Sequence, residues 1–243
     1  MNPIETFFSY FLFQFMYLLA LYVFKIINKT EFNGRENLPR TTKVLFISNH
    51  LTFIDSLLIG LGLVSLKELL FNYRHIPWNA PDKKNFFTNI IGVLFMRLMK
   101  NIPIDRKSNG AKYIKSLINK YCKILKKGTL LIFPEGGRTK NVNGELMDEC
   151  KPGVAMVILR MTMSDPDFKV VPIFISGMDK VMPREIGQKY LKIKSGKKIK
   201  MTIGKPVDFS KICNLDLSEK EKIKLIQKKV RDSIISLSPC LKK

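Results

Sequence analysis

The sequence predicts an α/β fold: a mostly parallel central sheet flanked by helices, with an N-terminal hydrophobic helix that anchors the chain to a membrane. Two patterns lead to this prediction. Short apolar runs alternate with segments of helical periodicity, which is typical of parallel sheets. In addition, residues 6–24 form a long apolar run without a single charged side chain.

The uncharged run is about 28 Å long as a helix, close to the thickness of the hydrocarbon core of a bilayer. Glu5 precedes it and no small-residue cleavage site follows, so it does not resemble a signal peptide. Spanning the membrane and lying in one leaflet both remain open, and a buried core helix is the weaker alternative. Basic residues after the run predict that its C-terminal side faces the cytoplasm: Lys25, Lys29, Arg35, Arg40 and Lys43.

Residues 1–30 are therefore predicted to be a membrane-anchoring helix, and residues 31–243 a single domain, because no linker or repeat divides them. The chain has 42 Lys and Arg against 20 Asp and Glu, a net charge of +22, which indicates an anionic partner. The basic residues are spread along the chain, which favours an anionic membrane over nucleic acid. The four cysteines match no metal-binding spacing and are read as reduced cytosolic thiols.

Residues 43–48, 129–133 and 169–176 are apolar runs that predict buried strands, and Pro172 within the last run indicates an edge strand or a bulge. Residues 101–105 are expected to be a short strand or a loop, and residues 190–204 a hairpin. Helical spacing is found in four segments: 53–70, 84–100, 108–127 and about 153–161.

Two of these helical predictions leave a choice open. Gly60 and Gly62 weaken the prediction for residues 53–70. Residues 84–100 have few charges, so they can pack in the core, line an acyl pocket or touch lipid, and core packing is favoured. A last helix begins at the capping box of Ser218 and Glu221 and ends before Pro239.

His50 follows the predicted strand 43–48 and precedes Asp55 by five residues. Residues five apart on an ideal helix do not face each other, but a helix that begins after His50 lets Asp55 reach back to the ring. A carboxylate on one imidazole nitrogen fixes the tautomer and leaves the other nitrogen available as a base. His50 and Asp55 are therefore the predicted catalytic pair. The other histidine, His75, has no acidic residue beside it and is interpreted as structural.

A second cluster, residues 133–139, has the sequence Phe-Pro-Glu-Gly-Gly-Arg-Thr and follows the predicted strand 129–133. Gly136 and Gly137 let backbone N–H groups approach an anion, and Arg138 beside them can bind two phosphate oxygens. An ordinary tight turn is the alternative, in which Glu135 ties down the loop. The carboxyl ends of parallel strands meet at one edge of a sheet, so His50, Arg106 and this cluster are expected to converge.

Together these motifs closely resemble the glycerolipid acyltransferase family, which includes the 1-acylglycerol-3-phosphate acyltransferases. The first family motif, Asn-His, four residues and then Asp, is found at residues 49–55. Residues 104–106, 133–139 and 170–173 are similar to the second, third and fourth motifs. The third motif departs from the usual Thr-Arg-Ser ending, because this chain has Gly137-Arg138-Thr139. The hydroxyl of Thr139 can still contact phosphate. Gly137 lacks the hydroxyl that the usual motif has at this position, and this loss bears on the choice of substrate.

The resemblance implies transfer of an acyl group from acyl-CoA or acyl-carrier protein to the free hydroxyl of a lysophospholipid. The first candidate acceptor is 1-acylglycerol-3-phosphate, which gives phosphatidic acid. His50 is then the base, and Asp55 orients it. No Gly-x-Ser-x-Gly motif is present, so direct transfer is expected. The implied substrate-binding residues are Arg106, Glu135, Gly136, Gly137, Arg138 and Thr139.

Two convergent guanidiniums, those of Arg106 and Arg138, favour a phosphate monoester over a zwitterionic headgroup. A plain surface charge is the alternative for Arg106. The expected partners are membrane lipids, the lysophospholipid and an acyl-carrier protein as one of two donors, without cofactor or metal. The expected location is the cytoplasmic face of the membrane, the inner one if the source is bacterial.

Two other classes of protein remain as alternatives. One is a non-catalytic protein that holds anionic lipid through the apolar run and the lysines. The other is a nucleic-acid binder, which only the charge suggests, since the sequence has no helix-turn-helix, zinc or RNA-binding signature.

Overall fold

A five-stranded sheet organises the chain in the computed structural model, which describes residues 3–71, 75–105, 108, 110–139, 150–183 and 192–238. The strands are β1 (Lys29–Asn33), β2 (Val44–Ser48), β3 (Leu130–Ile132), β4 (Lys169–Ser176) and β5 (Lys198–Ile203). The larger helices are α1 (Pro3–Leu21), α2 (Asp55–Leu63), α5 (Ile90–Leu98), α6 (Ala111–Leu125), α7 (Pro152–Ser164) and α10 (Glu219–Ile235). Shorter helices are η1 (Tyr22–Ile26), η2 (Arg35–Asn37), α3 (Leu66–Phe71), α4 (Lys83–Phe86), α8 (Met178–Val181) and α9 (Ser210–Cys213).

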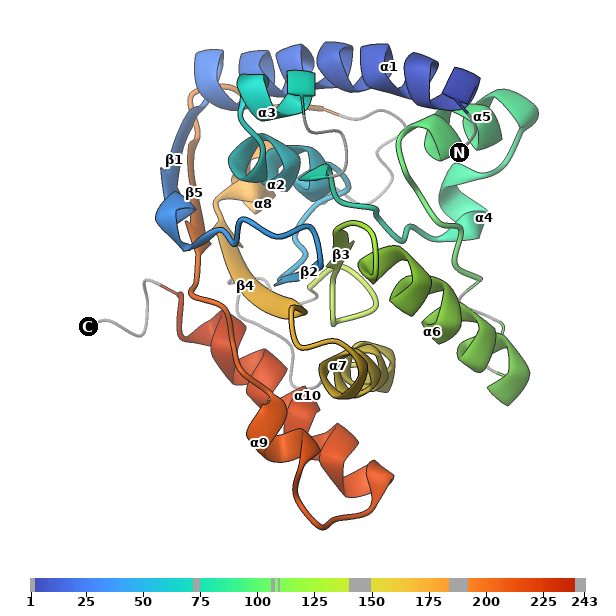
Figure 1. Ribbon diagram of the computed structural model, residues 1–243. Coiled ribbons are helices and arrows are strands. Elements are labelled where there is room, and N and C mark those ends of the chain that lie inside the picture. Colours follow the sequence, from blue (N-terminus) through green and yellow to red (C-terminus); the bar gives the residue numbers. More distant parts are fainter. Residues whose placement is uncertain are drawn as a thin grey trace.

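The strand order is β1-β5-β4-β2-β3, and only the pairing of β4 with β5 is antiparallel, so the predicted mostly parallel sheet is confirmed. All five residues of β2 are buried, as expected for a parallel strand that is covered on both faces. Leu45 and Ile47 of β2 pack among α6, α7 and α10, whereas Val44 and Phe46 pack on the side of α1 and α2. Figure 1 shows these two layers of helices on either side of the sheet.

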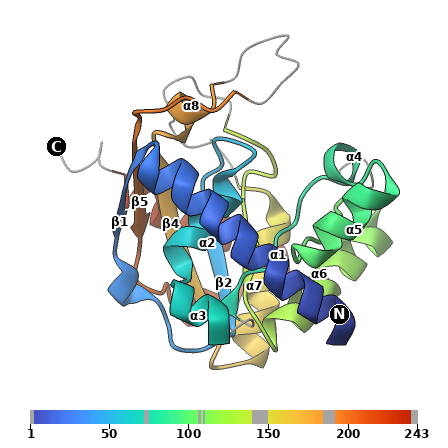
Figure 2. The same ribbon diagram turned by 90° about the horizontal axis from the view of Figure 1, so that it is seen from above.

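The apolar N-terminal helix lies along the domain, across α2 and toward α5 (Figures 1 and 2). Polar contacts hold it there. Arg97 of α5 forms an ion pair with Glu5 at 2.7 Å, and the hydroxyl of Tyr10 donates to the carbonyl of Leu70 at 2.5 Å. Ala20, Val23 and Phe24 enter the core beside α2. Within the described residues, Pro3–Ile26 is the one stretch long and apolar enough to cross a membrane.

The predicted helix 53–70 is wrong as a single element, because α2 ends at Leu63 and α3 begins at Leu66. Ser65 and Glu68 form a reciprocal cap between them: the Ser65 N–H donates to the Glu68 carboxylate at 2.8 Å, and the Glu68 N–H donates to the Ser65 hydroxyl at 3.2 Å. A cap of this kind starts a new helix. Gly62 has no room for a side chain, since an added Cβ would lie 2.4 Å from the sulfur of Met201.

Residues 84–100 likewise form two helices, α4 and α5, and the side chain of Asn89 caps the second by accepting from the Gly92 N–H. The preference for core packing is wrong here, because α5 has no buried residue. Ile90 and Ile91 are 85% and 77% exposed. Residues 101–105 form a loop with isolated bridges from Asn101 to Asn79 and from Ile104 to Asp82.

The predicted hairpin at 190–204 is wrong for its described part. Strand β5 begins only at Lys198, and both of its edges are occupied, one by β1 and the other by β4. No edge is left for a preceding hairpin strand. Strand β1 itself was not predicted, since its sequence Lys-Thr-Glu-Phe-Asn is too polar to stand out.

Pro172 lies in the central strand β4 rather than at an edge, and the bulge alternative is the one found. The register between β4 and its neighbour changes by one residue between the Ile173–Ile203 pair and the Val170–Val207 bridge. The carbonyl of Pro172 still accepts from the Gly204 N–H at 2.8 Å. Pro172 therefore lies where the segment after β5 departs from regular antiparallel pairing with β4.

Candidate active site

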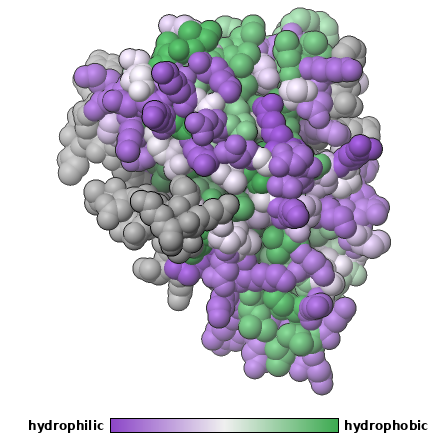
Figure 3. Space-filling model, turned by 90° about the vertical axis from the view of Figure 1, so that its left-hand side faces the viewer, coloured by the Kyte–Doolittle hydropathy of each residue, from purple (hydrophilic) through white to green (hydrophobic). Residues whose placement is uncertain are grey.

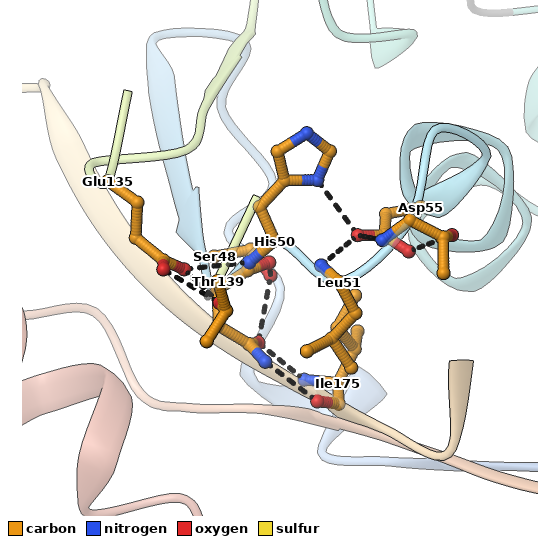
Figure 4. A network of polar contacts seen from close by, with 9 residues as sticks. Ser48, His50, Leu51, Asp55, Glu135, Thr139 and Ile175 are labelled. Atoms are coloured by element: carbon orange, nitrogen blue, oxygen red, sulfur yellow. Dashed lines mark hydrogen bonds and ion pairs between the residues drawn. The ribbon is translucent and has the colours of Figure 1, made fainter. Parts of the chain in front are cut away.

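His50 and Asp55 meet at the carboxyl end of β2. His50 lies in the turn after the strand, and Asp55 is the first residue of α2, so the helix begins after the histidine as the sequence argument required. Nδ1 of His50 lies 2.9 Å from Oδ2 of Asp55 (Figure 4). The carboxylate therefore holds the proton on Nδ1 and leaves Nε2 as the unprotonated nitrogen of the neutral ring.

The carboxylate of Asp55 is itself fixed by the turn that it closes. Oδ2 accepts the backbone N–H groups of Leu51 and Thr52 at 2.5 and 2.8 Å, and Oδ1 accepts the Thr52 hydroxyl at 2.6 Å. The side chain of Asp55 has no solvent exposure, whereas that of His50 is 15% exposed. A buried, fully bonded carboxylate thus orients an imidazole that remains accessible.

The backbone beneath the imidazole is also immobilised. The side-chain amide of Asn49 donates to the Ile175 carbonyl at 2.8 Å and accepts the Ile175 N–H at 2.8 Å, which ties the turn to β4. The ring of His50 stacks on Phe133, with ring centroids 4.0 Å apart and planes inclined by 13°. Phe133 was assigned no role from the sequence, because only the pairing of β2 with β3 brings the two rings together.

Glu135 and Thr139 link the loop after β3 to the histidine turn. The Glu135 carboxylate accepts the backbone N–H of His50 at 2.9 Å and the hydroxyl of Thr139 at 2.7 to 2.8 Å, and the Thr139 N–H donates to the His50 carbonyl at 2.6 Å. Burial raises the pKa of Glu135, and the hydrogen bonds from Thr139 and His50 oppose that rise. Figure 4 shows both side chains on the backbone side of His50 rather than beyond its ring.

The loop that contains Gly136 and Gly137, here called the glycine loop, lies at the same site as His50. Gly136 has φ +66°, a conformation that favours glycine, and an added Cβ would lie 3.0 Å from Cγ of Lys151. Arg138 lies over the ring of Phe53, with its guanidinium carbon 3.8 Å from the ring centroid. Phe53 in turn contacts Phe86 of α4 edge-on, with centroids 5.9 Å apart. Phe53 and Phe86 are further residues of the site that the sequence did not indicate.

A cavity of about 520 Å³ joins the histidine to Arg138. His50, Phe53 and Arg138 line it together with Gly136 and Gly137, whereas Glu135 and Thr139 do not. The rest of its wall is mainly apolar and comes from α1, α2 and α5, for example through Phe13, Leu57 and Phe95. Cavities that hold organic ligands have volumes of roughly 300–1,000 Å³.

Arg106 lies outside the described residues, so the structure does not place it. His75 does not line the cavity, and its carbonyl accepts the Thr129 hydroxyl at 3.0 Å. No cluster of three or more metal-binding side chains occurs in the part of the chain that the structure describes.

A family model described as Acyltransferase matches residues 29–176, more than half of the chain. The chain belongs to the acyltransferase family. The match contains His50, Asp55 and the glycine loop, all of which line or support the cavity.

Curated relatives in this family are similar over parts of their length. The chain is 24% identical over 201 residues to a 1-acyl-sn-glycerol-3-phosphate acyltransferase of Streptococcus pneumoniae, covering 80% of the chain and 62% of the relative. It is 30% identical over 107 residues to a protein of the same name from Bacillus subtilis, covering 44% of the chain and 47% of the relative. The chain therefore spans less than two thirds of the length of either relative.

A solved structure shares the fold. The 1-acyl-sn-glycerophosphate (LPA) acyltransferase PlsC from Thermotoga maritima superposes with a TM-score of 0.62 at 20% identity, over 96% of this chain and 80% of that one. At this identity the likeness shows a common acyltransferase fold, with the mixed sheet and its flanking helices.

Proposed function

We propose that the protein transfers an acyl group from a thioester donor to the free hydroxyl of a lysophospholipid. The proposed acceptor is 1-acylglycerol-3-phosphate, which gives phosphatidic acid. The observation that carries the proposal is the position of His50 and Arg138 on one mainly apolar cavity. A base, a cation and an apolar wall are the three features that a phosphorylated lipid alcohol needs. The names of the two curated relatives support this choice of acceptor.

The chemistry follows from the tautomer that Asp55 imposes. Nε2 of neutral His50 takes the proton of the lipid hydroxyl while the oxygen attacks the thioester carbonyl carbon. The tetrahedral intermediate collapses, the carbon–sulfur bond breaks, and the thiolate receives the proton back from the imidazolium. Asp55 stabilises the imidazolium in between, and general-base catalysis of this kind contributes roughly 10²–10⁴-fold in rate. The step needs no covalent enzyme intermediate and no cofactor besides the donor.

Arg138 binds the phosphate of the acceptor in this proposal, and the face of Phe53 keeps its guanidinium extended toward the cavity. Arg106 remains a predicted second phosphate ligand. Gly136 and Gly137 bring backbone close to the same anion. Glu135 and Thr139, whose polar atoms bond each other and the histidine turn, shape the loop rather than touch the substrate.

The membrane is the proposed location, with the active site on the cytoplasmic side. The neighbouring helices α1 and α5 expose large apolar side chains: Phe7, Phe8, Phe11, Phe15, Ile90, Ile91 and Leu94. Figure 3 shows hydrophobic residues along the upper edge, where α1 lies, above a mostly hydrophilic surface. A helix bound lengthwise to the domain with one apolar side outward fits one leaflet of a bilayer. Lysines elsewhere on the domain favour anionic lipid.

The proposal is tested by incubating purified protein in phospholipid vesicles with labelled palmitoyl-CoA or palmitoyl-acyl-carrier protein and a panel of lysolipids. We expect product with 1-acylglycerol-3-phosphate and less with lysophosphatidylcholine, whose phosphate is a diester. Product formed only with another lysolipid would show that the proposed acceptor is wrong. Binding to anionic vesicles without transfer to any acceptor would contradict the enzyme assignment and favour a lipid-holding protein.

A further inference from the structure

Helix α6 and the two residues after it present an unbroken row of positive charge to solvent. Residues 111–127 contain no acidic residue. At 100° per residue the lysines fall within an arc of about 140° on one side of the helix. The exposed lysines of this row, here called the α6 lysine face, are Lys112, Lys115, Lys120, Lys123, Lys126 and Lys127.

Helix stability does not account for this arrangement. Lys123 and Lys126 near the C-terminus suit the helix dipole, but Lys112 and Lys115 lie in the first turns, where positive charge is unfavourable. Lysines three or four residues apart repel each other at a cost of about 0.2–0.5 kcal/mol per pair. No ion pair to any residue that the structure describes offsets this cost, since the ion pairs lie elsewhere on the domain.

Helix α10 provides a comparison within the same chain. It carries as many basic residues, but Glu219, Glu221 and Asp232 are interspersed among them. The absence of acids on α6 is therefore a property of that helix and not of the lysine-rich composition alone. Arg160 of α7 adds to the positive side, since it donates to Asn119 on α6.

The α6 lysine face points to water rather than to the proposed membrane surface. The apolar side of α6, with Ile118, Tyr121 and Leu125, packs on the sheet face that α7 and α10 also cover. Helix α1 lies with α2 on the other face of the sheet. Figure 1 shows α6 sloping away from the layer that contains α1 and α5.

The α6 helix is nevertheless joined to the cavity. The hydroxyl of Tyr113, in its first turn, accepts the backbone N–H of Asp105 at 2.7 Å. The preceding Ile104 lines the cavity and pairs with Asp82, which lines it too. The first turn of α6, which contains Lys112, is thus joined to a segment that forms part of the cavity wall.

We propose that the α6 lysine face docks an acidic protein that carries the acyl thioester. From Lys112 to Lys127 it extends for about 22 Å, the length of a four-turn helix and more than the compact phosphates of coenzyme A require. A row of like charge on a helix is complementary to an acidic helix and accelerates encounter with it. The inference rests on the proposed function and names the donor for it.

The test compares two triple variants that change the net charge equally. One is Lys112→Glu, Lys115→Glu and Lys120→Glu on α6. The matched control, on α10, is Lys220→Glu, Lys224→Glu and Lys228→Glu, all at exposed positions. Binding of purified bacterial palmitoyl-acyl-carrier protein is measured by biolayer interferometry at two salt concentrations, and KM is measured with that donor and with palmitoyl-CoA. Circular dichroism shows that each variant is folded.

We expect the α6 variant to weaken carrier-protein binding and raise KM for that donor about tenfold or more, with KM for palmitoyl-CoA within about twofold of wild type. The α10 variant should differ little from wild type with either donor. Equal losses in both variants, or an equal rise in KM for palmitoyl-CoA, would overturn the proposal.

Two further results separate this proposal from others. Loss of binding to phosphatidylglycerol vesicles in the α6 variant, with carrier-protein binding intact, would make the α6 lysine face a membrane contact. Carrier-protein binding that depends on α6 in a protein that transfers no acyl group would support the docking surface and contradict the proposed function instead. Transfer from palmitoyl-CoA by a wild-type protein that binds no carrier protein would support the proposed function and contradict the docking surface.

Discussion

The hydroxyl of Thr139 shows how a residue expected to touch substrate can serve the scaffold. It donates to the buried carboxylate of Glu135, which holds the backbone N–H of His50. Without this donor the carboxylate keeps its charge in a buried place with fewer partners, and that is unfavourable by about 1–3 kcal/mol.

We therefore predict that Thr139→Val lowers the free energy of unfolding by about 1–3 kcal/mol, while KM for the phosphorylated acceptor stays within about twofold. Thr139→Ser, which keeps the hydroxyl, is the control and should be close to wild type. Urea unfolding and steady-state kinetics measure the two effects. A variant of normal stability with a raised KM would instead put the Thr139 hydroxyl on the phosphate.

A second residue-scale prediction concerns Phe53. The ring of Phe53 lies under the guanidinium of Arg138 and against the ring of Phe86, so it helps to hold the guanidinium in place. Phe53→Leu should raise KM for 1-acylglycerol-3-phosphate about three- to tenfold with a smaller change in kcat, because a cation–π contact contributes about 0.5–2 kcal/mol. Arg138→Ala should raise the same KM further.

The control for Phe53 is Phe53→Tyr, which retains the aromatic face and should behave as wild type. If leucine and tyrosine at position 53 give the same KM, the stacking contact has no part in acceptor binding.

Among single residues, the sequence predicted those that contact a residue close to them in the chain. Asp55 reaches His50 across one turn, so the five-residue spacing was informative. The stack of His50 on Phe133 and the contact of Arg138 with Phe53 join segments some 80 residues apart. Such contacts follow from strand pairing, which no local pattern specifies.

Among the elements, the turn that ends α5 contains an unusual buried charge. Lys100 is 3% exposed, has φ +51°, and donates to the carbonyl of Ile76 at 3.0 Å. Burial lowers the pKa of Lys100 to about 7. A folded-state pKa below the unfolded one means that the unfolded chain holds the proton more tightly, so stability rises with pH between about 7 and 10.

The prediction is that the free energy of unfolding of the wild type rises relative to that of Lys100→Met over this range, by up to about 1.4 kcal/mol per pH unit. Urea unfolding at pH 7.5 and pH 9 measures the difference. Lys115→Met, at an exposed position on α6, is the control and should parallel the wild type. Parallel profiles for wild type and Lys100→Met would show that Lys100 does not titrate in this range.

Elements with strong local signals were predicted well. The buried runs became β2, β3 and β4, the helical spacing of residues 108–127 became α6, and the capping box of Ser218 and Glu221 starts α10. The predictions were wrong where tertiary contacts, rather than the local sequence, determine the secondary structure. The polar strand β1 exists because β5 offers it an edge, and that same pairing prevents the hairpin that was expected before β5.

For the whole molecule, α1 contacts α5 and both helices leave large apolar side chains exposed, so α5 contributes to the surface rather than to the core. Whether residues 1–30 and 31–243 act as separate units stays a prediction. The N-terminal helix contributes Val23 and Phe24 to the core of the domain. We infer that α1 and α5 bind the membrane together.

The corresponding prediction is that Ile91→Glu with Leu94→Glu, on the exposed side of α5, reduces sedimentation with anionic vesicles at least about tenfold, since burying a charge at the interface opposes binding. The control is Leu215→Glu with Leu217→Glu, two exposed leucines that precede α10. Equal binding by both double variants would exclude α5 from the membrane surface.

The proposed acyl transfer depends most on the imidazole of His50 as the base. The most direct measurement is kcat/KM of His50→Ala with 1-acylglycerol-3-phosphate, alongside thermal unfolding of the same preparation. We predict a fall of about 10²–10⁴-fold with little change in unfolding temperature, because the 15% exposed ring carries no structural hydrogen bond other than the one to Asp55 among the described residues. A folded His50→Ala protein that retains kcat/KM within about threefold of wild type would contradict it.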